Sequence, residues 1–156
     1  MSLSNFRAWI VLAAGAVLSI GVSCALADDP FERLPIEYSK TAPDNAVSQL
    51  QAKLDRGEVS LKYDAEQGYL PAMLEALGVP TESQMLVFSK TSLQRSRISP
   101  RTARAIYFND DVYFGFCRAG EVMEVSVADP QLGAVFYTIE QKELVAPKLV
   151  RQTDNC

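Results

Sequence analysis

Residues 85–139 read MLVFSKTSLQRSRISPRTARAIYFNDDVYFGFCRAGEVMEVSVADPQLGAVFYTI, a segment in which apolar runs alternate with turn residues. Each run is four to six residues long and rich in Val, Ile, Phe and Tyr. The runs occupy residues 85–88, 105–108, 112–116, 122–127 and 134–139. Short apolar runs bounded by Asn, Asp, Gly or Pro predict consecutive antiparallel strands.

The segments between the later runs contain the residues that hairpin loops favour. We expect these loops at residues 109–111, 118–120 and 129–133. Within the run 122–127, Met123, Val125 and Val127 alternate with Glu124 and Ser126. Such alternation is typical of a strand that turns one face toward a core.

Upstream of the strands, the sequence predicts a short amphipathic helix. Asp44 is a suitable N-cap, and Val47, Leu50 and Leu54 then recur at spacings of three and four. Gly57 lies just beyond the last of these residues, where a helix commonly ends.

A second short helix is expected around Pro71, a residue that suits the first helical turn, and Gly78 marks its end. Its apolar face is formed by Leu70, Met73, Leu74 and Leu77. Between the two helices, residues 59–63 alternate apolar and polar side chains, which predicts one further strand.

Together these elements predict a single α+β domain, in which two short helices pack on a mainly antiparallel sheet of about five strands. Prolines punctuate residues 28–43, which indicates an extended arm ahead of the domain. The predicted order is a signal peptide at 1–27, the arm at 28–43, the α+β domain at 44–140 and a linker or tail, cut short, at 141–156.

The first 27 residues have the pattern of an export signal. Arg7 supplies the positive charge, an uncharged and mostly apolar stretch follows, and Ala25 and Ala27 form a small-x-small cleavage pattern. Cleavage would place the mature protein in the periplasm or outside the cell. The alternatives are an uncleaved membrane anchor, since about 18 apolar residues can span a bilayer, and lipidation at Cys24.

The composition is that of a globular protein, with 48% hydrophobic residues, 22% charged residues and a net charge of −4. Removing residues 1–27, whose one charged residue is Arg7, changes the net charge to −5. An acidic chain argues against nucleic acid as the main partner. The chain contains no histidine, which excludes a Ser-His-Asp triad, His-based acid–base catalysis and His metal ligands within it.

One basic segment, residues 90–104, contains no acidic residue. Arginine side chains form paired hydrogen bonds with carboxylate and phosphate oxygens, so this segment predicts an anion-binding site. The alternative is a solvated loop, or ion pairs with Asp110, Asp111 and Glu121 across the sheet. The cations of the segment are Lys90, Arg95, Arg97, Arg101 and Arg104.

The sequence contains no recognisable catalytic or metal-binding motif. Asp110 and Asp111 fit turn chemistry, and there is no Asp-x-Asp-x-Asp-Gly calcium loop, glycine-rich phosphate loop or Ser-x-x-Lys pattern. We therefore assign no catalytic residue and no metal ligand, and we expect no enzymatic activity from this chain alone. An acid–base enzyme that uses only carboxylates stays open as an alternative.

Cleavage of the signal would leave two cysteines, Cys117 and Cys156. Cys117 follows an apolar run and fits a small buried side chain. The alternative is a disulfide between the two, which export would permit.

Five strings carry a family resemblance, namely VFSKTSLQR at 87–95, RISP at 97–100, YFNDDVY at 107–113, DPQLGAVFYT at 129–138 and VRQTD at 150–154. They resemble the N-terminal region of a family of exported bacterial proteins described as cytochrome c domain-containing. The resemblance extends over residues 34–156, nearly all of the expected mature chain.

In that family the tail leads into a Cys-x-x-Cys-His motif, which binds haem c through two thioether bonds and a histidine ligand. Cys156 matches the first cysteine, and the remaining residues of the motif would follow it. The resemblance implies that the chain is the N-terminal part of a longer haem protein and completes no haem site as given. It also implies a role for the basic segment, since the haem propionates could contact Arg95, Arg97, Arg101 or Arg104.

Two functions are expected on these grounds. The first is a non-catalytic N-terminal module of an exported, haem-associated electron-transfer protein, whose partner is a redox protein or an attached C-terminal haem domain. The second is a haem-free periplasmic binding or interaction module that uses the basic segment. Membrane contact is expected only if the N-terminal segment stays uncleaved.

Overall fold

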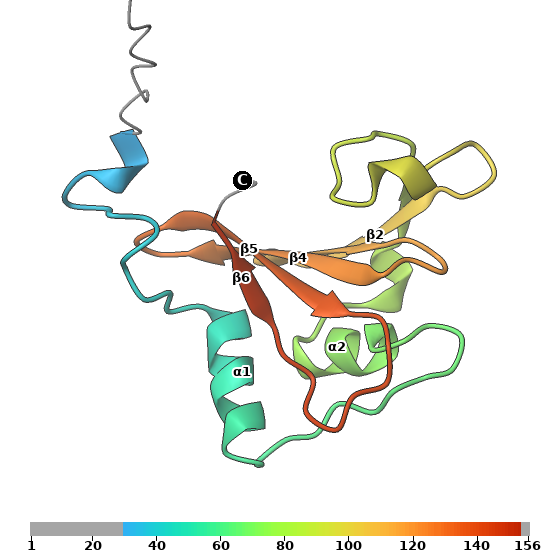
Figure 1. Ribbon diagram of the computed structural model, residues 1–156, viewed down its shortest axis with the longest axis horizontal. Coiled ribbons are helices and arrows are strands. Elements are labelled where there is room, and N and C mark those ends of the chain that lie inside the picture. The colour runs from blue at the N-terminus through green and yellow to red at the C-terminus, as the bar shows by residue number, and fades with distance from the viewer. Residues whose placement is uncertain (1–29, 154–156) are drawn as a thin grey trace, which may run out of the picture.

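The computed structural model describes residues 30–153, which form a six-stranded antiparallel sheet with two α-helices against one face (Figure 1). This confirms the predicted α+β fold and adds a sixth strand. Each strand pairs with the next one in the chain, and the order is β1 (Met85–Val87), β2 (Arg104–Phe108), β3 (Val112–Phe116), β4 (Val122–Asp129), β5 (Gly133–Glu140) and β6 (Val150–Gln152). The predicted signal peptide, Cys24 and Cys156 lie outside the described residues.

The helices are α1 (Ala46–Asp55) and α2 (Leu70–Ala76), and the chain also forms three short 3-10 helices, η1 (Pro30–Glu32), η2 (Thr81–Ser83) and η3 (Arg95–Arg97). Within residues 30–153, no helix combines the length and the apolar character needed to cross a bilayer.

The N-cap of α1 is Asn45, so the prediction of Asp44 is wrong by one residue. The Asn45 backbone is extended, and its side-chain Oδ1 accepts hydrogen bonds from the amides of Val47 at 3.1 Å and Ser48 at 3.0 Å. Only a side chain at this position reaches both amides of the first turn, as an N-cap must. The prediction for α2 is confirmed, with Pro71 in its first turn.

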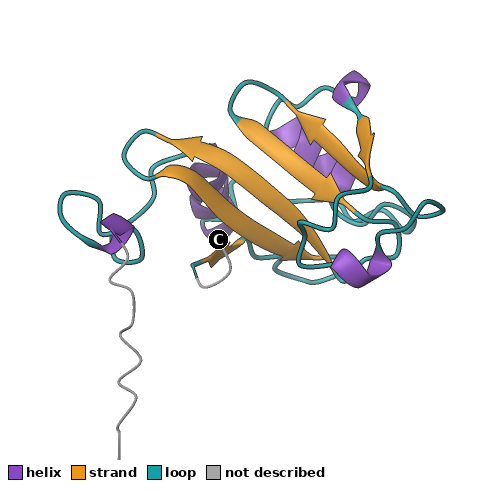
Figure 2. Ribbon diagram, turned by 90° about the horizontal axis from the view of Figure 1, so that it is seen from above, coloured by secondary structure: helices purple, strands orange, loops and turns teal. Residues whose placement is uncertain are grey.

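Both helices cover the same face of the sheet, and their apolar stripes meet the inward side chains of the strands (Figure 1). Val47 and Met73 are completely buried there, as are Phe114, Met123 and Val135 from the sheet. Each such side chain stabilises the fold by about 1.5–3 kcal/mol relative to exposure. Figure 2 shows the strands from above, where the opposite face of the sheet carries no α-helix within the described residues.

Asp129, at the end of β4, connects the start of α1 to the β4–β5 hairpin. Its Oδ2 accepts from the Asp44 amide at 2.8 Å and from Asn45 Nδ2 at 3.1 Å, and its Oδ1 accepts from the amides of Gln131 and Leu132. Burial disfavours the charge, but these hydrogen bonds outweigh burial and hold the pKa of Asp129 below its ordinary value. The ionised carboxylate is therefore a part of the folded structure.

The predicted strand at 59–63 is wrong. These residues form no strand, and the nearby pairing is a single bridge between Asp64 and Gly68. Tyr63 instead donates a hydrogen bond to the Gln141 carbonyl at 3.2 Å and packs edge-on against Tyr69, with ring centroids 5.1 Å apart. The alternating apolar residues Leu61 and Tyr63 pack against the core, so the segment shows the sequence pattern of a strand although its backbone pairs with no other strand.

The predicted extended arm at 28–43 is also wrong for the described part of that segment. Residues 30–41 form consecutive turns, closed by bonds such as Tyr38 N–H to the Phe31 carbonyl at 2.9 Å. The Tyr38 hydroxyl donates to the Ala134 carbonyl at 3.0 Å, which attaches these turns to β5.

The predicted linker at 141–156 contains β6, so that prediction is wrong at residues 150–152. β6 pairs with β5 through three residues, and Leu149 just before it is buried, with its amide donating to Gln51 Oε1 at 2.7 Å. Arg151 donates to the Thr41 carbonyl at 2.8 Å and lies over the Tyr38 ring. β6 has only three residues, and two of them, Arg151 and Gln152, are polar, so the sequence shows no apolar alternation that would predict a strand here.

Candidate functional site: a groove on the open face of the sheet

The segment from residue 88 to residue 103, here called the basic loop, lies on the sheet face opposite the α-helices (Figure 1). Between this loop and the strands is a groove of about 430 Å³. It is lined by Lys90, Thr91, Ser92, Leu93, Arg95, Arg104, Ile106, Tyr113, Phe114, Gly115, Glu124, Val125, Ser126, Phe136, Tyr137, Thr138 and Gln152. Its volume falls within the range of small-molecule sites.

Two buried side chains of the basic loop attach it to the molecule. Ile98 is 2% exposed, and Gln94 is 7% exposed although it is polar. Gln94 Nε2 donates to the Val122 carbonyl at 2.6 Å, and its Oε1 accepts from the Glu121 amide at 2.7 Å. The loop is thus held to the start of β4 rather than projecting into solvent.

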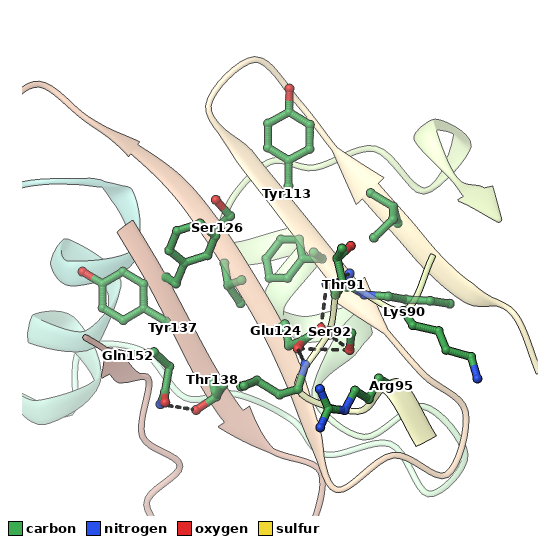
Figure 3. Close-up of a pocket in the computed structure, with 17 residues that line it drawn as sticks. Lys90, Thr91, Ser92, Arg95, Tyr113, Glu124, Ser126, Tyr137, Thr138 and Gln152 are labelled. Carbon is green, nitrogen blue, oxygen red and sulfur yellow. Dashed lines mark hydrogen bonds and ion pairs between the residues drawn. The ribbon is translucent and has the colours of Figure 1, made fainter. Parts of the chain in front are cut away.

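Glu124 holds the part of the loop nearest the groove. Its carboxylate accepts hydrogen bonds from the Leu93 amide at 2.6 Å and the Ser92 hydroxyl at 2.9 Å, as Figure 3 shows. It also forms an ion pair with Arg104 on β2, with Nη2 2.6 Å from Oε2. Both side chains of this pair are mostly buried, at 15% and 13% exposure, so the carboxylate is held by charge and by hydrogen bonds together.

Gly115 makes this ion pair possible. A Cβ at residue 115 would lie 2.1 Å from Arg104 Nη2 and 2.5 Å from Cζ, which is closer than nonbonded atoms approach. Glycine inside a strand commonly marks such a close approach. The Arg104 guanidinium therefore crosses β3 at the residue that has no side chain and reaches Glu124 on β4.

The floor of the groove is formed by side chains that share the open face. Ser126 on β4 is paired with Tyr113 on β3 and with Phe136 on β5. Tyr113 is 49% exposed and Phe136 is 38% exposed, so two aromatic rings flank a short polar side chain. At one end of the floor, Gln152 on β6 donates to Thr138 Oγ1 at 2.9 Å (Figure 3).

The groove is cationic although the chain is acidic. Its lining contains four charged residues, and two of them, Arg104 and Glu124, neutralise one another. Lys90 and Arg95 are exposed, and neither has an ion-pair partner among residues 30–153. They extend from the same loop at one side of the groove (Figure 3), which gives its lining a net charge of +2 in a chain of net charge −4.

The predicted anion-binding residues are separated by the fold. Arg95 lines the groove, whereas Arg104 is bound to Glu124 within it. Arg97 forms an ion pair with Glu121 at 2.9 Å. This is one of the ion pairs across the sheet that the sequence suggested as the alternative to an anion-binding site. Arg101 is exposed and lies outside the groove lining. Of the four arginines, Arg95 alone lines the groove without an ion-pair partner among the described residues, and Lys90 shares this position.

The described residues hold no group of three or more His, Cys, Asp or Glu side chains that could bind a metal ion, and the chain has no histidine. Cys117 is buried and free, and burial raises the pKa of its thiol, with nearby Arg104 opposing the shift in part. The prediction that Cys117 is a small buried side chain is therefore confirmed.

Sequence reasoning missed most of the groove. Glu124 and Ser126 were placed together on one strand face, but nothing indicated that the loop would lie over them. The one available signal was Gly115 in the middle of an apolar run, which indicates a close approach without identifying the approaching group.

Comparison with protein-family models, with curated proteins and with solved structures gives no match for this chain. The resemblance to exported cytochrome c domain-containing proteins therefore stays a prediction.

Proposed function

We propose that this chain is a non-catalytic binding module and that the groove on the open face of the sheet is its binding site for a small organic anion. The observation that carries the proposal is the pair of cations, Lys90 and Arg95, beside a half-buried floor of aromatic and polar side chains. A ligand in the groove would gain apolar contact with the floor and charge complementarity from the loop.

The one carboxylate of the groove lining has a role in holding the basic loop. Glu124 is the one carboxylate in the lining, and it is already held by Arg104, Ser92 and Leu93. Its contacts fix the basic loop in place, which gives it a structural role at the site.

The test uses 1-anilinonaphthalene-8-sulfonate, a fluorescent aromatic anion, as the probe. The Lys90→Ala/Arg95→Ala double variant is compared with an Arg101→Ala/Arg118→Ala double variant, which removes two exposed cations outside the groove. Exposed ion pairs contribute about 0.2–1 kcal/mol each, so the first variant should weaken binding roughly twofold to thirtyfold. The second should leave affinity unchanged, and equal losses in both variants would contradict the proposal.

The proposal includes export, because the first 27 residues have the pattern of an export signal. The groove would then meet ligands beyond the cell membrane. Expression of the whole chain and mass analysis of the released protein should give a mature N-terminus at Asp28. Recovery of the intact chain in the membrane fraction would favour the uncleaved anchor instead.

A second candidate is the haem-associated module, and one observation favours it. Gln152, in β6, lines the groove, and Cys156 follows only four residues later. Four residues span at most about 14 Å, so a haem attached at Cys156 would be tethered near the end of the groove that Gln152 forms. The Lys90 and Arg95 cations suit haem propionates, and in the family motif the iron ligand is the histidine that follows the second cysteine.

This candidate is tested first in the DNA that follows the Cys156 codon. All three reading frames should be searched for the completion of a Cys-x-x-Cys-His motif. If a completed chain carries haem, Arg95→Ala should alter haem retention or the redox potential, whereas Arg101→Ala should not. A downstream sequence without any such motif would eliminate this candidate and leave the binding module untouched.

A further inference from the structure

We infer that the ligand of the groove carries a planar aromatic ring, which stacks against Tyr113 and Phe136 above Ser126, and an acidic group that meets Lys90 and Arg95. The inference rests on the proposed function and adds the chemical class of the ligand. It is built from the strand register, the exposure of the rings, the hydrogen-bonding state of the groove hydroxyls and the position of the two cations.

The register places the aromatic side chains in one row across the open face. Phe108 pairs with Tyr113, Tyr113 with Ser126, and Ser126 with Phe136. Phe108 and Tyr113 stack with their planes 13° apart and their centroids 5.8 Å apart. Ser126 interrupts this row with a short side chain, and neighbouring strands lie about 4.8 Å apart, so the strands that carry Tyr113 and Phe136 are about 10 Å apart.

Both rings keep surface that a stacking partner can cover. Tyr113 is 49% exposed and Phe136 is 38% exposed, although each lines the groove. An added aromatic ring would bury this surface and would extend the existing stack of Phe108 and Tyr113 over the Ser126 position. Aromatic pairs are favourable beyond the area that they bury, which gives a planar ring an advantage over a saturated one.

Three hydroxyls of the groove lining already have hydrogen-bond partners, which leaves fewer of them for a polyhydroxy ligand such as an acidic sugar. The Thr91 hydroxyl bonds with Ser89, that of Ser92 with Glu124, and that of Thr138 with Gln152. A sugar needs several polar partners that are free to bond with it, whereas a flat apolar ring needs few. Together with the exposed rings of Tyr113 and Phe136, this favours a flat ring over a polyol, and the Ser126 and Tyr113 hydroxyls are left to meet a polar substituent of the ring.

The two cations of the basic loop indicate the side of the groove on which an acidic group of the ligand would lie. The basic loop is bound at Glu124, which precedes Ser126 by two residues on β4, a separation of about 7 Å along the strand. Lys90 and Arg95 belong to the loop on this side of the groove (Figure 3). A carboxylate or a phosphate on the loop side of a fused ring would face these cations, and both acids present the same charge-assisted chemistry.

The experiment titrates the protein with 2-naphthoate and with decalin-2-carboxylate, which has the same charge and a similar size but is not planar. Parallel titrations use 2-naphthyl phosphate, neutral naphthalene-2-carboxamide and glucuronate, and all are followed by calorimetry and NMR. We expect 2-naphthoate to bind at least threefold more tightly than the saturated acid, the amide and glucuronate. Whichever of the naphthoate and the naphthyl phosphate binds more tightly identifies the acidic group.

Variants at Ser126 and Tyr113 locate the ring. Ser126→Leu fills the space between the aromatic side chains and should weaken 2-naphthoate binding roughly three- to tenfold, whereas Ser126→Ala leaves it open and should bind within twofold of wild type. If Ser126→Leu fails to fold, Tyr113→Leu and Tyr113→Phe give the same contrast between a lost and a retained ring.

Equal binding of the planar and saturated acids, or of glucuronate and 2-naphthoate, would overturn the inference about the ring. So would full affinity in Ser126→Leu, or in Tyr113→Leu where Ser126→Leu does not fold. In these cases the proposed function would still stand if the Lys90→Ala/Arg95→Ala variant loses affinity for the sulfonate probe. If the ring variants keep their affinity for 2-naphthoate and the Lys90→Ala/Arg95→Ala variant keeps its affinity for the sulfonate probe, both the inference and the proposed function are wrong.

Discussion

Replacing Gly115 by alanine should destabilise the protein through a clash with Arg104. The new Cβ would lie 2.1 Å from Arg104 Nη2 and 2.4 Å from Nε, so the guanidinium must leave its position beside Glu124. The contact that is lost is the 2.6 Å ion pair between two side chains that are at most 15% exposed.

The size of the effect follows from two opposing contributions. A hydrogen bond to a charged group contributes about 1.5–3 kcal/mol when it is buried, whereas alanine is favoured over glycine within a strand by about 0.5–1 kcal/mol. The net loss should therefore be about 0.5–2.5 kcal/mol. Glu124 keeps its bonds from Ser92 and Leu93, which limits the damage.

A double-mutant cycle separates the clash from any other effect of the methyl group. In an Arg104→Ala background the guanidinium no longer occupies the space, so Gly115→Ala should become neutral or stabilise by about 0.5–1 kcal/mol. The free energy of unfolding is measured by urea titration with circular dichroism. An equal loss in both backgrounds would refute the argument that Gly115 exists to admit the guanidinium.

Three further predictions concern stability and reactivity. Leu149→Ala should cost about 2–4 kcal/mol in urea unfolding because Leu149 is buried before β6, whereas Val145→Ala, at a fully exposed position, should stay within about 0.5 kcal/mol. Equal effects would mean that the segment before β6 is a linker after all. Asp129→Asn should cost about 1–3 kcal/mol at pH 7, and exposed Asp110→Asn should cost little. Because the pKa of Asp129 is lower in the folded state than the unfolded value near 3.9, its contribution is present at neutral pH and lost as the pH falls below about 4; a variant difference that does not shrink in acid would contradict this. Cys117 should react with a thiol reagent in urea but not in the native protein, since burial covers the thiol and raises its pKa; rapid native labelling, measured by mass in a Cys156→Ser background, would contradict this.

The β-hairpins and both helices could be predicted from local sequence because each depends on neighbours in the chain. The runs at 105–108, 112–116 and 122–127 are rich in β-branched and aromatic residues and are followed by turn residues. Each of these strands pairs with the strand that follows it in the chain. The Pro71 helix was predicted for the same reason, since its start and its apolar stripe lie within a few residues.

The groove depends on contacts that no local pattern contains. Glu124 meets Ser92 and Leu93 from more than 30 residues away in the chain, and Gly115 admits a side chain from another strand. The same holds for β6, whose three residues form a strand only because β5 pairs with them. The sequence by itself determined the sheet, the helices and the presence of a basic segment; the tertiary structure alone decided which cations pair with acids and which face a ligand, because burial and ion pairing depend on the side chains that the fold brings together.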